Sequence, residues 1–239
     1  VVDASLHLSL KELAMALGVN DDEIDISTWG PIIANINASG TANNLHLDEV
    51  YAELSDSFIF TVQGAIKRAC DESKRNGQVD LLGDFYDLSR FEGWVADDGS
   101  IKIPQQMILK GMAGINGSKI HTQLSLHQGK GVVNLIADYD TSSEAYKVQG
   151  DIDSLNINHF MPAQPLYNLS LNLNAKGAGI DFMSKKSSGE FDLHLNELKY
   201  DQLAFRKFNL NALLNSGKLA TKISSDNPIV TGTIDGYYM

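Results

Sequence analysis

Apolar and polar residues alternate along most of this chain, in short segments separated by turn residues. The clearest segment is YNLSLNLNA at 167–175, and FDLHL at 191–195 repeats the pattern. Successive side chains of a β-strand point to opposite faces of a sheet, so each segment presents one apolar and one polar face. The pattern predicts an all-β protein with a long apolar surface that must be covered.

The turn residues between these segments indicate how the strands are connected. Signals such as Asn76-Gly77, Asn116-Gly117 and Asn215-Ser216-Gly217 recur every ~10–12 residues and favour hairpins. Gly129-Lys130-Gly131 is a further expected turn, and 203–214 is expected to be a single strand. These connections predict an antiparallel meander rather than βαβ units.

Two segments depart from the alternation. Leu10, Leu13, Ala14 and Leu17 follow helical spacing before Gly18, which predicts a short helix near 10–17. Residues 86–94 lose the alternation and predict a short helix or a loop. We therefore expect one or two short helices beside the strands.

Composition excludes several function classes. The net charge of −11 argues against a nucleic-acid partner, because phosphate binding requires clustered Lys and Arg. A single cysteine, Cys70, excludes an intramolecular disulfide and a zinc site built from cysteines. No apolar run approaches the ~20 residues of a membrane-spanning helix, so we expect no transmembrane segment in this fragment.

Chemical motifs are absent from the sequence. The six histidines are dispersed, and neither H-E-x-x-H nor G-x-S-x-G occurs. The acidic stretch at 20–25 lacks the spacing of a calcium loop, so a hydrated loop is expected there. We expect no catalytic residue, no cofactor and no metal site, and a protein that is not an enzyme.

The apolar face leaves two alternatives open. In the first, a structural or adhesive β-sandwich closes over a dry core and binds through loops such as 20–25. In the second, the sheet is curved and open, and acyl chains or another protein's strands cover its inner face. Periodicity alone favours the closed core. A lipid tail of ~16 carbons could nevertheless gain on the order of 10 kcal/mol in a groove, at ~0.8 kcal/mol per buried methylene.

Several segments resemble the carboxy-terminal region of the TamB translocation-and-assembly module family, which is related to the AsmA-like proteins. The likeness is densest between Ile103 and Asp181 and is carried by degenerate β-repeat patterns. The segments are LKGMAG at 109–114, ADYD at 137–140, LNINHFMP at 155–162, LSLNLNAKGAG at 169–179, NALLNSGK at 211–218, SDNP at 225–228 and, earlier, DESKRNG at 71–77.

This resemblance implies an elongated, curved antiparallel β-sheet groove (β-taco-like) with an apolar interior. It also implies a periplasmic protein of the Gram-negative envelope, whose full-length form is anchored in the inner membrane. The family is implicated in carrying phospholipid acyl chains between membranes and in outer-membrane protein assembly and translocation, with a TamA- or BamA-like partner in the outer membrane. It supplies no catalytic residues.

The site expected from this reasoning is a hydrophobic groove lining chosen by face. The candidates all lie at apolar positions of alternating segments: Leu124, Leu126, Leu169, Leu171, Leu173, Phe191, Leu193 and Leu195. Their partners would be phospholipid acyl chains or β-strands of outer-membrane proteins.

The turn signal Asp98-Gly99 separates two halves of the pattern. We expect a first β-groove segment at 1–100, with the helix near 10–17, and a second at 101–239. Both are expected to belong to one continuous sheet. The chain opens with Val1-Val2-Asp3 rather than Met, which indicates a fragment of a longer protein.

Overall fold

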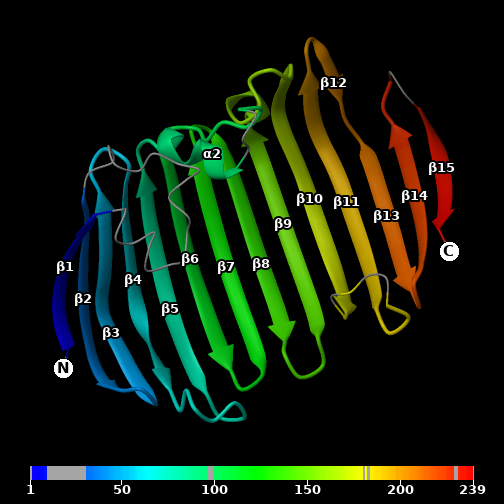
Figure 1. The fold of residues 1–239 in the computed structure, drawn as a ribbon. Coiled ribbons are helices and arrows are strands. Elements are labelled where there is room, and N and C mark those ends of the chain that lie inside the picture. Colours follow the sequence, from blue (N-terminus) through cyan, green and yellow to red (C-terminus); the bar gives the residue numbers. More distant parts are fainter. Residues whose placement is uncertain are drawn as a thin grey trace. The chain divides into compact units, whose positions relative to one another are not determined.

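The computed structural model describes residues 2–9, 31–95, 99–179, 181, 184–228 and 231–238. Within these ranges the chain is an antiparallel all-β protein with very little helix, as the alternation predicts (Figure 1). The described strands do not close on themselves, because β1 pairs with β2 alone and β15 with β14 alone. The chain divides into two compact units between Gly117 and Ser118.

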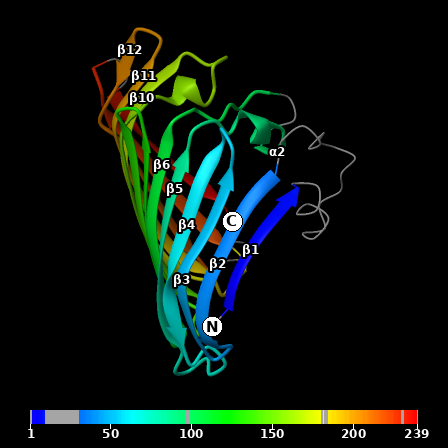
Figure 2. The ribbon, with the colours of Figure 1, turned by 90° about the vertical axis from the view of Figure 1, so that its left-hand side faces the viewer.

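The first unit is a meander whose strands follow one another in chain order. Its strands are β1 (Val2–Ser9), β2 (Pro31–Thr41), β3 (Asn44–Leu54), β4 (Phe58–Lys67), β5 (Asn76–Phe85) and β6 (Met107–Asn116). Each pairs antiparallel with the next, and β1 to β4 lie side by side in Figure 2. The helix predicted near 10–17 and the acidic loop at 20–25 lie outside the described residues.

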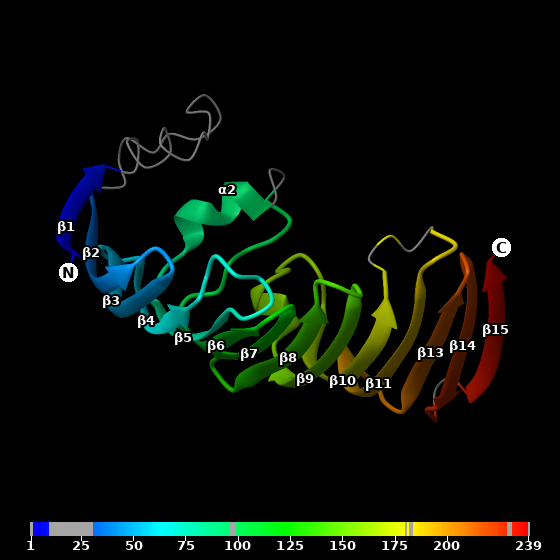
Figure 3. The same ribbon diagram turned by 90° about the horizontal axis from the view of Figure 1, so that it is seen from below.

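A short helical segment follows β5, where the alternation is lost. It consists of η2 (Ser89–Phe91) and α2 (Glu92–Val95), which confirms the expectation for 86–94. Figure 3 shows it to one side of the strands of this unit. The Phe91 ring lies 6.2 Å from that of Phe58 on β4, and Glu92 accepts hydrogen bonds from Lys102 Nζ and the Ile103 N–H. The segment therefore covers the sheet at one end of its strands.

Of the described apolar residues of the first unit that are buried, all but Ala38 gather at this covered end. Ile32, Leu54 and Met107 are buried, and the strand register places them in one cross-strand row with Phe58 and Phe85. The N–H groups of residues 86 and 87 donate to the carbonyl of buried Ser57, in the turn after Leu54. Hydrogen bonds and aromatic packing thus hold the covering segment on the row.

The second unit is also one sheet. Its strands are β7 (Lys119–Gln128), β8 (Gly131–Asp140), β9 (Ala145–Leu155), β10 (Leu166–Ala178), β11 (Ser188–Tyr200), β12 (Leu203–Phe205), β13 (Phe208–Asn215), β14 (Lys218–Asp226) and β15 (Thr231–Tyr238), with the short helix η3 (Ile157–His159). The strand order is β7-β8-β9-β10-β11-β13-β14-β15, and β12 pairs with β11. Apart from β12, Figure 3 shows these strands one after another in this order.

Most of the expected turns are present. Gly129-Lys130 joins β7 to β8, and Ser216-Gly217, both with positive φ, joins β13 to β14. The four residues 141–144 join β8 to β9. In that turn the N–H and hydroxyl of Ser142 donate to the Asp140 carboxylate, which lowers the pKa of Asp140 to about 2. Local polar contacts therefore fix this hairpin.

Two local predictions are wrong. Asn76-Gly77 is not a turn but the first two residues of β5, and the connection from β4 occupies 68–75. A Cβ on Gly77 would lie 2.5 Å from the Ala65 carbonyl oxygen, so the glycine permits close approach of β4.

The second wrong prediction is the single strand at 203–214, which is two strands, β12 and β13. Lys207 between them has a φ of 58°, outside the extended region. The apolar phase changes at this point, because Leu203 and Phe205 are odd positions whereas Phe208 and Leu210 are even. That change of phase marks the break.

Candidate functional site

The predicted lining residues share one face of the second unit. Residues paired across antiparallel strands point to the same side of a sheet. Leu124 belongs to a row that continues through Leu173 to Leu193, and Leu126 to a row that continues through Leu171 to Leu195. Phe191 lies on β11 two residues before Leu193, on the same side.

Leu169 joins this face beyond an irregularity in the register. The pairing of β10 with both its neighbours shifts near Ser170, and Ser154 on β9 has a φ of 53°. Leu169 then lies opposite Leu155, which is buried. The structure therefore brings all eight predicted residues together on one apolar face.

The same face contains further apolar residues that the sequence analysis did not select. Most are paired with the predicted residues or continue their rows: Leu135, Val133, Ile152, Leu210, Phe208 and Ile223. Leu214 and Leu219 lie opposite each other on the same side of β13 and β14. The sequence feature that could have identified them is the same alternation of apolar and polar residues, followed from one strand across the turn into the next. We call this whole surface the apolar face.

The apolar face is only partly buried. Among the described hydrophobic residues of this unit, Leu155 alone is buried, whereas Ile234 and Tyr238 are 68% and 59% exposed. The described strands of the unit form a single sheet, so no second sheet of the same unit lies over them. A contiguous apolar surface with this exposure is typical of a binding surface.

The opposite face of the second unit is polar and hydrogen-bonded across its strands. His121 and Asp138 are 2.6 Å apart, and Asn211 donates to Asp192 at 2.6 Å. Lys176 and Glu190 form an ion pair of 2.7 Å, and the Glu190 carboxylate raises the pKa of Lys176. These side chains mark the side of the sheet that faces water, and they form hydrogen bonds and ion pairs with each other across the strands.

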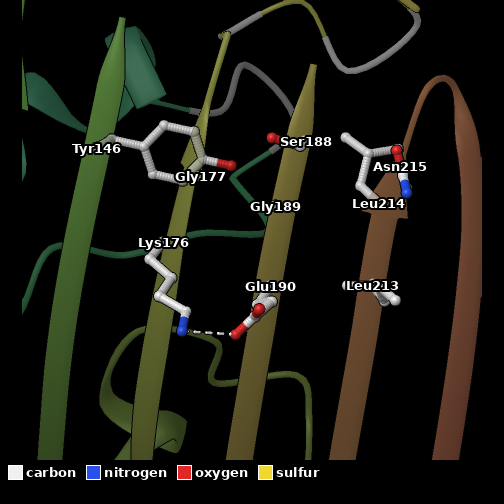
Figure 4. Close-up of a pocket in the computed structure, with 9 residues that line it drawn as sticks. All are labelled: Tyr146, Lys176, Gly177, Ser188, Gly189, Glu190, Leu213, Leu214 and Asn215. Carbon is white, nitrogen blue, oxygen red and sulfur yellow. Dashed lines mark ion pairs between the residues drawn. The ribbon is translucent and has the colours of Figure 1, made fainter. Parts of the chain in front are cut away.

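Two glycines are paired across β10 and β11 near the connection between these strands, where they leave space above the sheet (Figure 4). Gly177 lies opposite Gly189, and Tyr146 on β9 lies opposite Gly177. The Tyr146 hydroxyl occupies the space that a side chain would take, 2.6 and 2.7 Å from the ideal Cβ positions of the two glycines. A cavity of about 460 Å³ adjoins them, and its other walls include Lys176, Ser188 and Leu214.

A second cavity shares Tyr146 and Gly189 and lies against the apolar face. Its volume is about 350 Å³, and Ala175, Ala212 and Tyr238 contribute to its lining. It is hollow because a glycine and two alanines occupy positions that leucine and phenylalanine fill elsewhere on the face.

We expect Gly177→Ala to destabilise the chain by about 1–3 kcal/mol, because it overpacks the β10–β11 contact. The new Cβ would lie 2.2 Å from the Ser188 carbonyl oxygen and 2.8 Å from the Gly189 Cα, both backbone atoms. Gly232→Ala on β15 is the matched control, because nothing lies within 4 Å of its Cβ position. Urea denaturation of both variants measures the difference, and equal unfolding free energies would contradict it.

The described residues contain no cluster of three or more His, Cys, Asp or Glu side chains that could hold a metal ion. In the same part of the chain, no helix has the length and hydropathy needed to cross a membrane.

Comparison with protein-family models, with curated proteins and with solved structures finds no match to this chain.

Proposed function

We propose that this chain is a non-enzymatic groove protein that carries phospholipid acyl chains on its apolar face. The observation that carries the proposal is the strand register, which aligns the predicted leucines in two rows across β7 to β11, one apolar on every strand and the other interrupted only by Gly150 on β9. Because these rows remain partly exposed, an apolar ligand that covers them would gain the hydrophobic free energy of their burial.

Hydrogen bonding favours an acyl chain over a peptide strand as the occupant of the face. The backbone N–H and C=O groups of the inner strands, such as β9 and β10, are used in pairing with their neighbours. A peptide laid across the face would therefore leave its own backbone groups without partners, at a cost of ~1–3 kcal/mol each. A hydrocarbon chain has no such groups. Strands of outer-membrane proteins could pair only along an edge of a sheet.

The cellular setting of the proposal follows the resemblance to the TamB family. The chain would act in the periplasm of a Gram-negative envelope, as part of a protein anchored in the inner membrane and working with a TamA- or BamA-like outer-membrane partner. Assistance to outer-membrane protein assembly and translocation is the second role that this resemblance implies. The apolar face supports the lipid role more directly.

Native mass spectrometry tests the proposal. The chain is purified from bacterial membranes and sprayed under conditions that preserve noncovalent complexes. We expect adducts with phospholipid masses, which are released on collisional activation. A chain that carries no lipid, and that also fails to take up phospholipid from mixed micelles, would favour a structural or adhesive module with a closed core.

A further inference from the structure

The cavity of about 350 Å³ is a distinct feature of the apolar face. Its floor is formed where Ala175 on β10, Gly189 on β11 and Ala212 on β13 lie on neighbouring strands. Two larger side chains rise beside these small residues: Phe191 lies between Ala175 and Ala212 in the register, and Tyr146 comes from β9. The cavity thus combines a small-residue floor with aromatic and aliphatic walls.

We propose that this cavity, which we call the acyl hollow, is a discrete binding site for one unbranched hydrocarbon chain. The inference rests on the proposed function and goes beyond it, because it assigns the place at which a bound chain is held. The part of the hydrocarbon chain that lies outside the acyl hollow would then follow the rows of leucines.

The size of the acyl hollow fits a single small molecule. Its volume of about 350 Å³ lies at the lower end of the ~300–1,000 Å³ usual for ligand sites. An α-helix is ~10–12 Å across with its side chains and is too bulky for such a space. The volume therefore favours a slender ligand over a folded element of a partner.

The charges around the acyl hollow fit an uncharged occupant. The residues of the apolar face that line it carry no formal charge. Glu190 also contributes to the lining, but its carboxylate is paired with Lys176. A second copy of this chain is a poor occupant, because two chains of net charge −11 repel each other.

The acyl hollow is continuous with the predicted lining residues. Phe191 belongs to both, and Leu193 and Leu195 follow on the same side of β11. From Gly189 to Leu195 the strand advances roughly 20 Å at ~3.3 Å per residue. An extended acyl chain can follow this line, with one part in the acyl hollow and the rest along the leucines.

Filling the acyl hollow with a larger side chain tests the proposal. Ala212→Phe on β13 places a ring over the floor, whereas the control Ala220→Phe changes the neighbouring strand β14 on the opposite face. The probe is a fluorescent polyene fatty acid, titrated into the 239-residue chain. We expect Ala212→Phe to raise the Kd of the probe by at least about tenfold and Ala220→Phe to leave it unchanged.

Equal probe affinity of the two variants would overturn the acyl hollow and leave the proposed function standing. Failure of the unaltered chain to bind the probe would instead contradict both the acyl hollow and the proposed function. Circular dichroism shows whether each variant folds.

A second measurement needs no substitution in the chain. Palmitic acid carrying a photoreactive diazirine near its methyl end is irradiated with the unaltered protein, and labelled peptides are identified by mass spectrometry. Label on the peptides that contain Ala175, Phe191 or Ala212 supports the acyl hollow. Label confined to the peptides of β7 and β8 contradicts it.

Discussion

Replacing Leu171 by aspartate is expected to abolish lipid retention while the chain remains folded. Leu171 lies in the middle of the apolar face, between Ile152 on β9 and Leu195 on β11. An acyl chain that covers this position would have to remove a carboxylate from water, which costs at least about 3 kcal/mol or more than a hundredfold in affinity. In the empty protein the same carboxylate stays hydrated, because Leu171 is not buried.

The control for this experiment adds the same charge to the other face. Gln149→Asp changes an exposed residue on β9, opposite Ile136 and Asn174 on the polar face. We expect this variant to retain lipid as the unaltered chain does, by native mass spectrometry. Unfolding of Leu171→Asp would indicate that a facing layer of protein covers the residue. Unchanged lipid binding would show that acyl chains do not pass over it.

The strands could be predicted from the sequence because the alternation has a period of two and leaves little freedom in where side chains point. That Leu171 and Leu173 share one face follows from this rule alone. The break at Lys207 has a signal in the sequence, the change of apolar phase, which the prediction of a single strand did not take into account. The position of Asn76-Gly77 was not predicted, because it depends on how β4 and β5 approach one another. A glycine suits a turn and a close strand contact equally well, so local chemistry does not separate the two.

The acyl hollow is beyond what alternation can indicate. Its floor consists of Ala175, Gly189 and Ala212, which are far apart in the sequence and meet only through the register of β10, β11 and β13. Tyr146 covers the glycine pair from a further strand. A prediction of this feature would require the pairing of each strand, and the phase of the alternation does not give that pairing.

The two ends of the sheet in the second unit differ. At the end where β9 finishes, Leu155 and Asn227 are buried, and the buried Gln128 amide lies 3.0 Å from the imidazole of His159 on η3. At the other end lie the short connections 141–144 and 216–217 and the acyl hollow. The described hydrophobic residue of this unit that is buried, Leu155, therefore lies at the end away from the acyl hollow, whereas the buried residue near the hollow is the polar Ser187.

Leu54→Ala is expected to cause the largest loss of stability among single substitutions of the first unit. Leu54 is 1% exposed and lies between Ile32 and Phe58 in the row that η2 covers. Removing its buried methyl groups leaves a space that the paired strands on either side cannot close. The free energy of unfolding should fall by about 2–5 kcal/mol.

The matched substitution for Leu54→Ala is Leu82→Ala. Leu82 lies on β5, is 46% exposed, and pairs with Thr61 and Lys110 on the side of the sheet opposite to Leu54 and Phe85. Its truncation should change the unfolding free energy by no more than about 0.5 kcal/mol. Urea denaturation followed by circular dichroism compares the two. Similar midpoints would mean that the row at Leu54 is not the packed core of this unit.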